Sequence, residues 1–341
     1  MFRKLSNKLL LIIFVILAIV AVIVLVHDSK KGERTFKSEL FSVDSAAVSS
    51  ITIYPKGNGK EILKLKKSGK EWDVVFKDKH YPADSSLIKN ILHELAHITP
   101  ERVAGTDKTS WKQFEISDSA SSRVVVEQGN NITADFRVGK VSFTQGQGPQ
   151  RYRSNQNVDV KSHLRVAGDD RVYEVEGFLS MMFSNNPAQY RNRMLLRFDK
   201  NQVMKLTFIY PGDSSFVLAR KGNKWYIDDQ PADSSGTEKY LNSTYYINGN
   251  EFADESAVFP NYRYTLKIEG NNMSPIEVNG AIDEGVKKYY IKSNANPSAI
   301  FGSASPNLFN QIFKGKSSFF PGKAEGKEKK VTRQQSHRVK R

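Results

Sequence analysis

One five-residue motif, Pro-Ala-Asp-Ser-Ser, occurs twice in this chain, at residues 82–86 and again at residues 231–235. The sequence before the motif repeats too. In the two copies Ile-Tyr-Pro lies at residues 53–55 and 209–211, and Gly-x-x-Trp ends at Trp72 and Trp225. A match of this length indicates duplication, so the folded part must be built from one unit used twice. The repeat constrains the architecture and reveals no reaction.

The residues around the first copy predict three antiparallel strands followed by a helix. Apolar and polar side chains alternate over residues 48–54 and 61–67, and a third short strand covers residues 72–76. Glycines at the intervening turns suit hairpins. Asp84 is placed to cap a helix. The apolar side chains of that helix recur at helical spacing and fall on one face: Leu87, Ile88, Ile91, Leu92 and Leu95.

A second, different unit follows each copy of the first. After the first copy we expect strands at residues 123–128, 132–138, 151–153 and 172–175, and a short helix at residues 178–183. After the second copy, which covers residues 203–247, the order returns with strands at 264–268, 276–278 and 289–294 and a short helix at 308–313. The predicted order is first unit, second unit, first unit, second unit.

The turns between these strands set the expected fold class. They are short and rich in glycine and asparagine, which suits antiparallel strands, since parallel strands need long crossover connections. The sequence therefore predicts an α+β fold with tandem duplicated modules of antiparallel β-sheet, each with a helix packed on one face. We place the first module pair at residues 43–195 and the second at residues 196–320, each long enough for its own core.

Residues 9–26 are eighteen consecutive apolar residues without a charge. At about 1.5 Å of rise per residue, a helix of this length spans roughly 27 Å, close to the hydrocarbon thickness of a bilayer. A cleaved signal peptide is the alternative, but no clear small-x-small cleavage site follows the run. We expect a single transmembrane helix, with residues 1–8 in the cytoplasm, residues 27–42 as a tether and the large remainder outside the cytoplasm.

The formal net charge of +15 is concentrated at the two ends of the chain. From Lys323 onward there are eight lysines and arginines against two glutamates, with few large apolar side chains. We predict that residues 321–341 form a disordered basic tail. Because the expected topology places this tail outside the cytoplasm, we expect no nucleic-acid partner. Contact with anionic lipid or an envelope polymer is one role for the tail, and solubility alone is the other.

The segment from His93 to His97 reads His-Glu-Leu-Ala-His and matches the His-Glu-x-x-His pattern of zinc peptidases. On a helix its two imidazoles share a face and can hold Zn²⁺, with Glu94 placed to activate a bound water. A catalytic zinc usually needs a third protein ligand. The nearest options in the sequence are Glu101, His80 and Glu115.

The second copy of the repeat weakens the zinc hypothesis. At the corresponding places, residues 242–246, it reads Asn-Ser-Thr-Tyr-Tyr, so the scaffold does not require a metal. The apolar face of the first helix also directs both histidines away from the core. We interpret them as surface histidines, and a zinc-dependent hydrolase using His93 and His97 stays the alternative function.

Other sequence signals for chemistry are weak. Paired carboxylates at residues 169–170 and 228–229 lie in turn-like segments, and no stretch has the form of a phosphate loop or a nucleophile elbow. The chain has no cysteine, which excludes disulfides, thiolate metal sites and cysteine nucleophiles. We therefore assign no catalytic, cofactor-binding or metal-binding residue and expect no cofactor.

Several short segments resemble the bacterial family called domain of unknown function 4340, over roughly residues 43–315. They are Val-Ser-Ser-Ile-Thr-Ile from Val48, Lys-Glu-Trp at Trp72, Pro-Ala-Asp from Pro82, Arg153, Val-Tyr-Glu-Val from Val172, and the link at residues 191–199. The resemblance implies an envelope protein with one N-terminal span, whose relatives often accompany ABC-type transport systems similar to those linked to gliding motility. The family has no agreed catalytic residues.

We derive one expected function from the predicted membrane anchor, the duplicated scaffold and the family resemblance. We expect a membrane-anchored extracytoplasmic binding or scaffold protein, accessory to an ABC-type transport system, rather than an enzyme. The expected location is the bacterial inner membrane, with a single pass and the bulk of the chain in the periplasm. The expected partners are the membrane itself and other envelope or ABC-transporter proteins.

Overall fold

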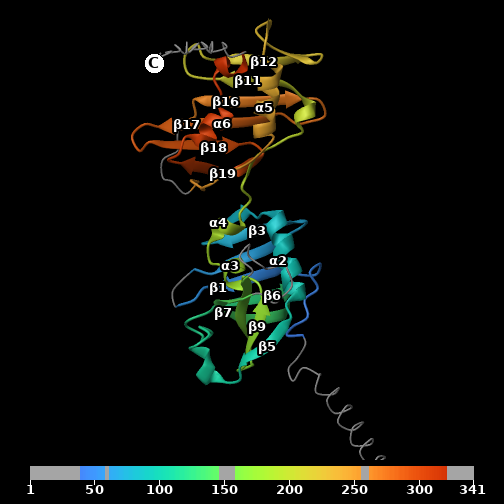
Figure 1. The fold of residues 1–341 in the computed structure, drawn as a ribbon, viewed down its shortest axis with the longest axis vertical. Coiled ribbons are helices and arrows are strands. Elements are labelled where there is room, and N and C mark those ends of the chain that lie inside the picture. The colour runs from blue at the N-terminus through green and yellow to red at the C-terminus, as the bar shows by residue number, and fades with distance from the viewer. Residues whose placement is uncertain (1–38, 58–60, 146–157, 255–260, 321–341) are drawn as a thin grey trace, which may run out of the picture. The chain divides into compact units, whose positions relative to one another are not determined.

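The computed structural model describes residues 39–57, 61–145, 158–254 and 261–320 (Figure 1). Their contacts divide the chain into two compact units, with the boundary between Asn192 and Arg193. Each unit has its own large hydrophobic core.

The first unit is built on one nine-stranded sheet with the order β4-β3-β2-β1-β6-β7-β8-β9-β5, in which all neighbouring strands are antiparallel. Alternation sets the inward face: Ile51 pairs with Leu65 on one side and Val126 on the other, and all three side chains are buried. The strands are β1 Ser50–Tyr54, β2 Leu63–Ser68, β3 Glu71–Phe76, β4 Lys79–Pro82, β5 Pro100–Gly105, β6 Ser122–Gln128, β7 Asn131–Gln145, β8 Val158–Val166 and β9 Val172–Glu176.

The main helix of this unit, α2 Ser85–His97, begins because Asp84 caps it. The Asp84 carboxylate accepts hydrogen bonds from the backbone nitrogens of Ser86 at 2.9 Å and Leu87 at 3.0 Å. The helix buries Ile88, Ile91 and Leu95. The described residues of the unit also form three short helices: η1 Lys108–Trp111, α3 Leu179–Met182 and α4 Pro187–Tyr190.

The second unit has an eight-stranded antiparallel sheet, β14-β13-β12-β11-β16-β17-β18-β19, and a separate pair, β10-β15. Its strands are β10 Met194–Arg197, β11 Val203–Ile209, β12 Phe216–Lys221, β13 Lys224–Ile227, β14 Gln230–Pro231, β15 Tyr246–Asn248, β16 Tyr264–Gly270, β17 Ile276–Asp283, β18 Lys288–Ser293 and β19 Asn296–Ser303. Its helices are η3 Lys200–Gln202, α5 Ser234–Thr244, α6 Asn307–Ile312 and η4 Lys316–Phe319.

The repeated motif has the same local structure in both units. The residue before the cap, an alanine, donates its backbone N–H to the carbonyl of the strand tryptophan, and the capping aspartate donates to an aromatic residue at the unit's far end. These bonds, all 2.8 Å long, run from Ala83 to Trp72, Ala232 to Trp225, Asp84 to Tyr190 and Asp233 to Phe319. The two aspartate bonds fasten the last described turn of each unit to the start of α2 or α5, and the two alanine bonds join that start to the preceding tryptophan strand.

The expected fold class, α+β with a helix packed on one face of each sheet, is wrong. Among the described residues 46% lie in strands and 19% in helices, so the protein is mainly β. The physical reason is that the helices are too short to cover the sheets. A helix such as α2, with 13 residues, is about 20 Å long, whereas nine strands at about 4.8 Å spacing make a sheet roughly 40 Å wide. The helices add buried side chains to the cores but form no layer over a sheet face.

Three predictions fall outside the described residues: the transmembrane helix at residues 9–26, the basic tail at residues 321–341 and the strand at residues 151–153. Within the part of the chain that the structure does describe, no helix is both long and apolar enough to cross a membrane.

Candidate functional site

A stretch of the first unit without strands, residues 107–121, packs on the outward face of β7 and β8, and we call it the cover segment. Phe114 of this segment stacks on His163 of β8, with ring centroids 4.6 Å apart. The carbonyl of Phe114 accepts a hydrogen bond from the backbone N–H of Lys140 at 3.0 Å. A β-carbon on Gly139 would lie 2.3 Å from that carbonyl oxygen, so only glycine permits this close approach.

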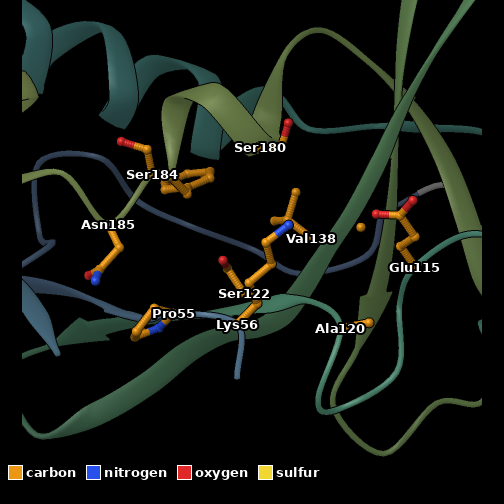
Figure 2. A pocket seen from close by; sticks show the side chains of 11 residues that line it. Pro55, Lys56, Glu115, Ala120, Ser122, Val138, Ser180, Ser184 and Asn185 are labelled. Carbon is orange, nitrogen blue, oxygen red and sulfur yellow. The ribbon is translucent and has the colours of Figure 1, made fainter. Parts of the chain in front are cut away.

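A cavity of about 450 Å³ opens where the cover segment meets the end of β1 and helix α3. Figure 2 shows Ser180 and Ser184 on one side, Pro55, Lys56 and Ser122 on the other, and Glu115 on the right. The lining residues are Pro55, Lys56, Glu115, Ala120, Ser122, Val138, Gly139, Ser180, Phe183, Ser184 and Asn185. The walls come from segments far apart in sequence, so folding of the unit creates the cavity.

The cavity offers hydrogen-bonding groups of both kinds and one charge of each sign. Lys56 supplies an ammonium, drawn beside Val138 in Figure 2, and Glu115 supplies a carboxylate from the cover segment. The amide oxygen Oδ1 of Asn185 is buried and has no hydrogen-bond partner among the described residues. An unsatisfied buried acceptor costs about 1–3 kcal/mol, so a donor from a bound molecule or a water suits this place. The arrangement fits a small polar or zwitterionic group.

The cavity contains serines without a histidine. A serine nucleophile requires a base within hydrogen-bond reach, and no histidine is among the residues that line the cavity. Ser184 donates its hydroxyl to the Gln189 side chain at 2.5 Å, and among the described residues no hydrogen bond joins Lys56 to a cavity serine.

Next to the cavity, the outward face of β8 carries an unusual set of buried charged and polar side chains: Asp159, Lys161, His163 and Arg165. Lys161 pairs with Glu101 at 2.5 Å and lies 3.6 Å from Glu176. This set was not predicted from the sequence, because residues 158–166 were not recognised as a strand. The signal that could have found it is the alternation in Val-Asp-Val-Lys-Ser-His-Leu-Arg-Val, which Ser162 alone interrupts.

His163 lies at the centre of this set and is 2% exposed. Its Nδ1–H donates to the carbonyl oxygen of Lys140 at 3.1 Å, and its Nε2 lies 3.5 Å from Glu174. Burial lowers the pKa of His163 below its usual value, although the hydrogen bond to Lys140 and the charge of Glu174 act to raise it. Arg102 holds Glu174 with two hydrogen bonds, at 2.9 and 2.6 Å, which weakens the pull of that carboxylate on the imidazole.

The His93 to His97 segment lies on α2 as the spacing predicts, and both histidines are exposed. Their ring centroids are 4.2 Å apart. His97 donates Nδ1–H to the carbonyl oxygen of His93 at 2.6 Å, which leaves Nε2 as its free ring nitrogen. The pair is therefore available to solvent, as the interpretation of surface histidines expects.

The three candidate third ligands are not brought to this pair. Glu101 pairs with Lys161, His80 is on β4, and Glu115 lines the cavity. Across the described residues, no group of three histidine, cysteine, aspartate or glutamate side chains is placed to hold a metal ion. The structure does not assemble the zinc site that the alternative function requires.

Comparison with known proteins gives one match. A family model described as "Domain of unknown function (DUF4340)" matches residues 72–257. No curated protein and no solved structure matches the chain. The matched residues include the cover segment and most of the cavity lining, from Glu115 to Asn185, whereas Pro55 and Lys56 lie before them.

Proposed function

Because this chain belongs to the family described as Domain of unknown function (DUF4340), whose description assigns no reaction, we propose a function from the site itself. The protein is a membrane-anchored extracytoplasmic binding or scaffold protein, accessory to an ABC-type transport system of the bacterial envelope. It binds rather than catalyses.

The observation that carries the binding role is the cavity of about 450 Å³ with the unpaired acceptor Asn185. Ligand sites are concave and use a few placed polar groups to orient what they bind. This cavity has such groups in Lys56, Glu115 and Asn185, and its lining contains no histidine. Its rim residue Ser180 is exposed, which gives a partner access.

The membrane and envelope parts of the proposal rest on the sequence. The apolar residues 9–26 match the thickness of a bilayer, and Arg3, Lys4 and Lys8 lie on one side of them without an acidic residue. This arrangement supports an inner-membrane location with the bulk of the chain in the periplasm. The basic residues 323–341 support an additional contact with anionic lipid head groups or an envelope polymer.

The decisive experiment is crosslinking of the full-length protein in cells. A photoreactive residue is placed at Ser180 on the cavity rim, and a matched control is placed at Lys70, an exposed residue of the same unit. We expect Ser180 to capture subunits of an ABC-type permease or another envelope protein and Lys70 to capture none. Recovery of the uncrosslinked protein alone from both sites would overturn the proposal.

A further inference from the structure

Three arginines lie side by side on neighbouring strands of the first unit. Arg123 of β6 is directly opposite Arg137 of β7, and Arg137 is directly opposite Arg165 of β8. Like charges opposite each other on adjacent strands repel and destabilise a sheet. A row of three guanidinium groups is therefore stable only if anions lie close enough to offset the repulsion.

Two carboxylates partly neutralise the row. Asp135 accepts two hydrogen bonds from Arg123, at 2.8 Å from Nε and 2.5 Å from Nη2. Asp118, on the cover segment, uses one oxygen, Oδ1, for both of the other arginines: Nε of Arg137 lies at 2.8 Å and Nη2 of Arg165 at 2.5 Å. Within this cluster three cations face two anions, so one positive charge is left over.

Arg165 is the most enclosed member of the row. It is 8% exposed, and its guanidinium carbon lies 3.8 Å from the centroid of the Trp111 ring. Its Nε is buried and has no hydrogen-bond partner among the described residues. Burial, and then the neighbouring Arg165 and Arg123, lower the pKa of Arg137 although Asp118 raises it. An additional anion would relieve the crowding of positive charge among the three arginines.

A pocket of about 200 Å³ lies at this cluster. It is lined by Asp118, Arg123, Asp135, Phe136, Arg137, Arg165, Ala167 and Gly168. The Asp118 side chain is 71% exposed, whereas those of Arg137 and Arg165 are 21% and 10% exposed. Asp118, which bridges the half-buried Arg137 and the buried Arg165, is thus the most solvent-accessible member of the bridge.

We propose that this pocket binds a small oxyanion, a phosphate or carboxylate group, against Arg137 and Arg165. Guanidinium groups present planar pairs of donors that match these anions. In the absence of a ligand, the Asp118 carboxylate accepts from these guanidinium groups, and it competes with the ligand for the same donors. The site is separate from the cavity of Figure 2, so it does not depend on the proposed function.

The competing explanation is that the ion pairs only fasten the cover segment to the sheet. The two explanations differ at Asp118. If the carboxylate competes with a ligand, its removal takes a negative charge from Nε of Arg137 and Nη2 of Arg165 and strengthens anion binding, while Nη1 of Arg137 keeps its hydrogen bond to the Asp118 backbone carbonyl at 3.1 Å. If the carboxylate only holds the cover segment on the sheet, its removal lowers the stability of the fold and does not increase the affinity for anions.

The test is titration of the purified full-length protein with inorganic phosphate and, separately, with acetate, each at constant ionic strength set by chloride. We expect Asp118→Asn to bind phosphate about tenfold more tightly than the unchanged protein, since a competing charge-assisted partner is lost. Arg165→Gln should abolish binding, and Arg165→Lys should restore only part of it because lysine lacks the planar fork.

Glu269→Gln is the matched control. It removes a carboxylate from an exposed cross-strand ion pair, Lys205 with Glu269 at 2.9 Å, in the second unit, and should leave phosphate binding unchanged. Binding of phosphate but not acetate supports a tetrahedral oxyanion as ligand, and binding of both supports a carboxylate-tolerant site. Absence of binding to both the unchanged protein and Asp118→Asn, with native circular dichroism, overturns the proposal.

Discussion

Arg165 stacks on Trp111, with the guanidinium carbon 3.8 Å from the centroid of the indole ring. The contact joins two segments more than fifty residues apart and holds the cover segment over the charged face of β8. The indole N–H also donates to the carbonyl oxygen of Asp170 at 2.8 Å. Trp111 therefore fixes the cover segment at two points.

Replacement of Trp111 should loosen the cover segment without unfolding the sheet. A stacked cation–π pair contributes about 0.5–2 kcal/mol, so we expect Trp111→Ala to raise amide hydrogen exchange across residues 107–121. Trp111→Phe keeps a ring for the stack and loses only the hydrogen bond, so its effect should be smaller. Exchange in β16 of the second unit serves as the internal control, and an equal rise there would contradict the prediction.

Gly139 should tolerate no side chain. A β-carbon there would lie 2.3 Å from the Phe114 carbonyl oxygen and 2.9 Å from Ile116 Cδ1. Overpacking of this kind costs about 1–3 kcal/mol, so Gly139→Ala should lower the melting temperature of the first unit in calorimetry. Gly315→Ala is the control, because its β-carbon would approach nothing closer than Ser317 Oγ at 4.0 Å. Equal losses in both variants would refute the steric argument.

The two capping aspartates should differ in their contribution to stability. Asp84 accepts two backbone hydrogen bonds at the start of α2, whereas Asp233 accepts one, from Ser235 at 3.0 Å, at the start of α5. Loss of such a cap costs about 0.5–2 kcal/mol. We expect Asp84→Ala to lower the free energy of unfolding of its unit more than Asp233→Ala does. Denaturant unfolding of both variants measures this, and the opposite order would count against the hydrogen-bond explanation.

The buried His163 should make the first unit less stable in mild acid. Burial lowers its folded pKa below the usual 6.5, so the unfolded chain takes up the proton first as the pH falls. The stability from the neutral imidazole is then complete above about pH 6.5 and decreases below it. His163→Gln should flatten the stability profile between about pH 6.5 and 5.

The exposed His80 provides the control for this pH effect. His80→Gln should leave the acid-side slope of the stability profile as it is in the unchanged protein. A slope that persists in His163→Gln would mean that other groups cause the pH dependence. Asp169 is one such group at lower pH. Burial alone would raise its pKa, but hydrogen bonds from Arg171 and Tyr173 have the larger effect and lower the pKa to about 2.

The histidine pair on α2 should hold no stoichiometric zinc. Two exposed imidazoles without a third protein ligand bind zinc weakly, and none of the three candidate ligands is near them in the structure. Metal analysis of the purified protein after dialysis should give the same low zinc content for the unchanged chain and for His93→Ala. One zinc per chain, lost in His93→Ala, would restore the hydrolase hypothesis.

Several features could be read from the sequence because they depend on neighbours along the chain. Alternation over residues 48–54 and 61–67 indicated β1 and β2, and Asp84 marked the start of α2. Such local signals have a fixed period or a fixed place, and each copy of the repeat carries them independently. The family resemblance rested on the same segments and is confirmed by the match over residues 72–257.

Several strands were not recognised from the sequence, and β4, β5, β8 and β19 are among them. The burial of the charged side chains of β8 could not have been predicted from the sequence either. The alternation in β8 is typical of a strand with one face in solvent. That face is buried because the cover segment, which precedes β8 by about forty residues in the sequence, lies on it.

By itself, then, the sequence determined the duplication, the family, and three of the four strands that precede the helix in each copy, since these depend on residues near one another in the chain. The fourth strands, β4 and β14, were not predicted. Only the tertiary structure decided that sheets dominate the fold, that His93 and His97 have no third ligand, and that Arg123, Arg137 and Arg165 share one pocket. Those outcomes depend on which distant segments meet. The alternation within one strand shows which of its side chains share a face, but it does not show which strand lies beside it.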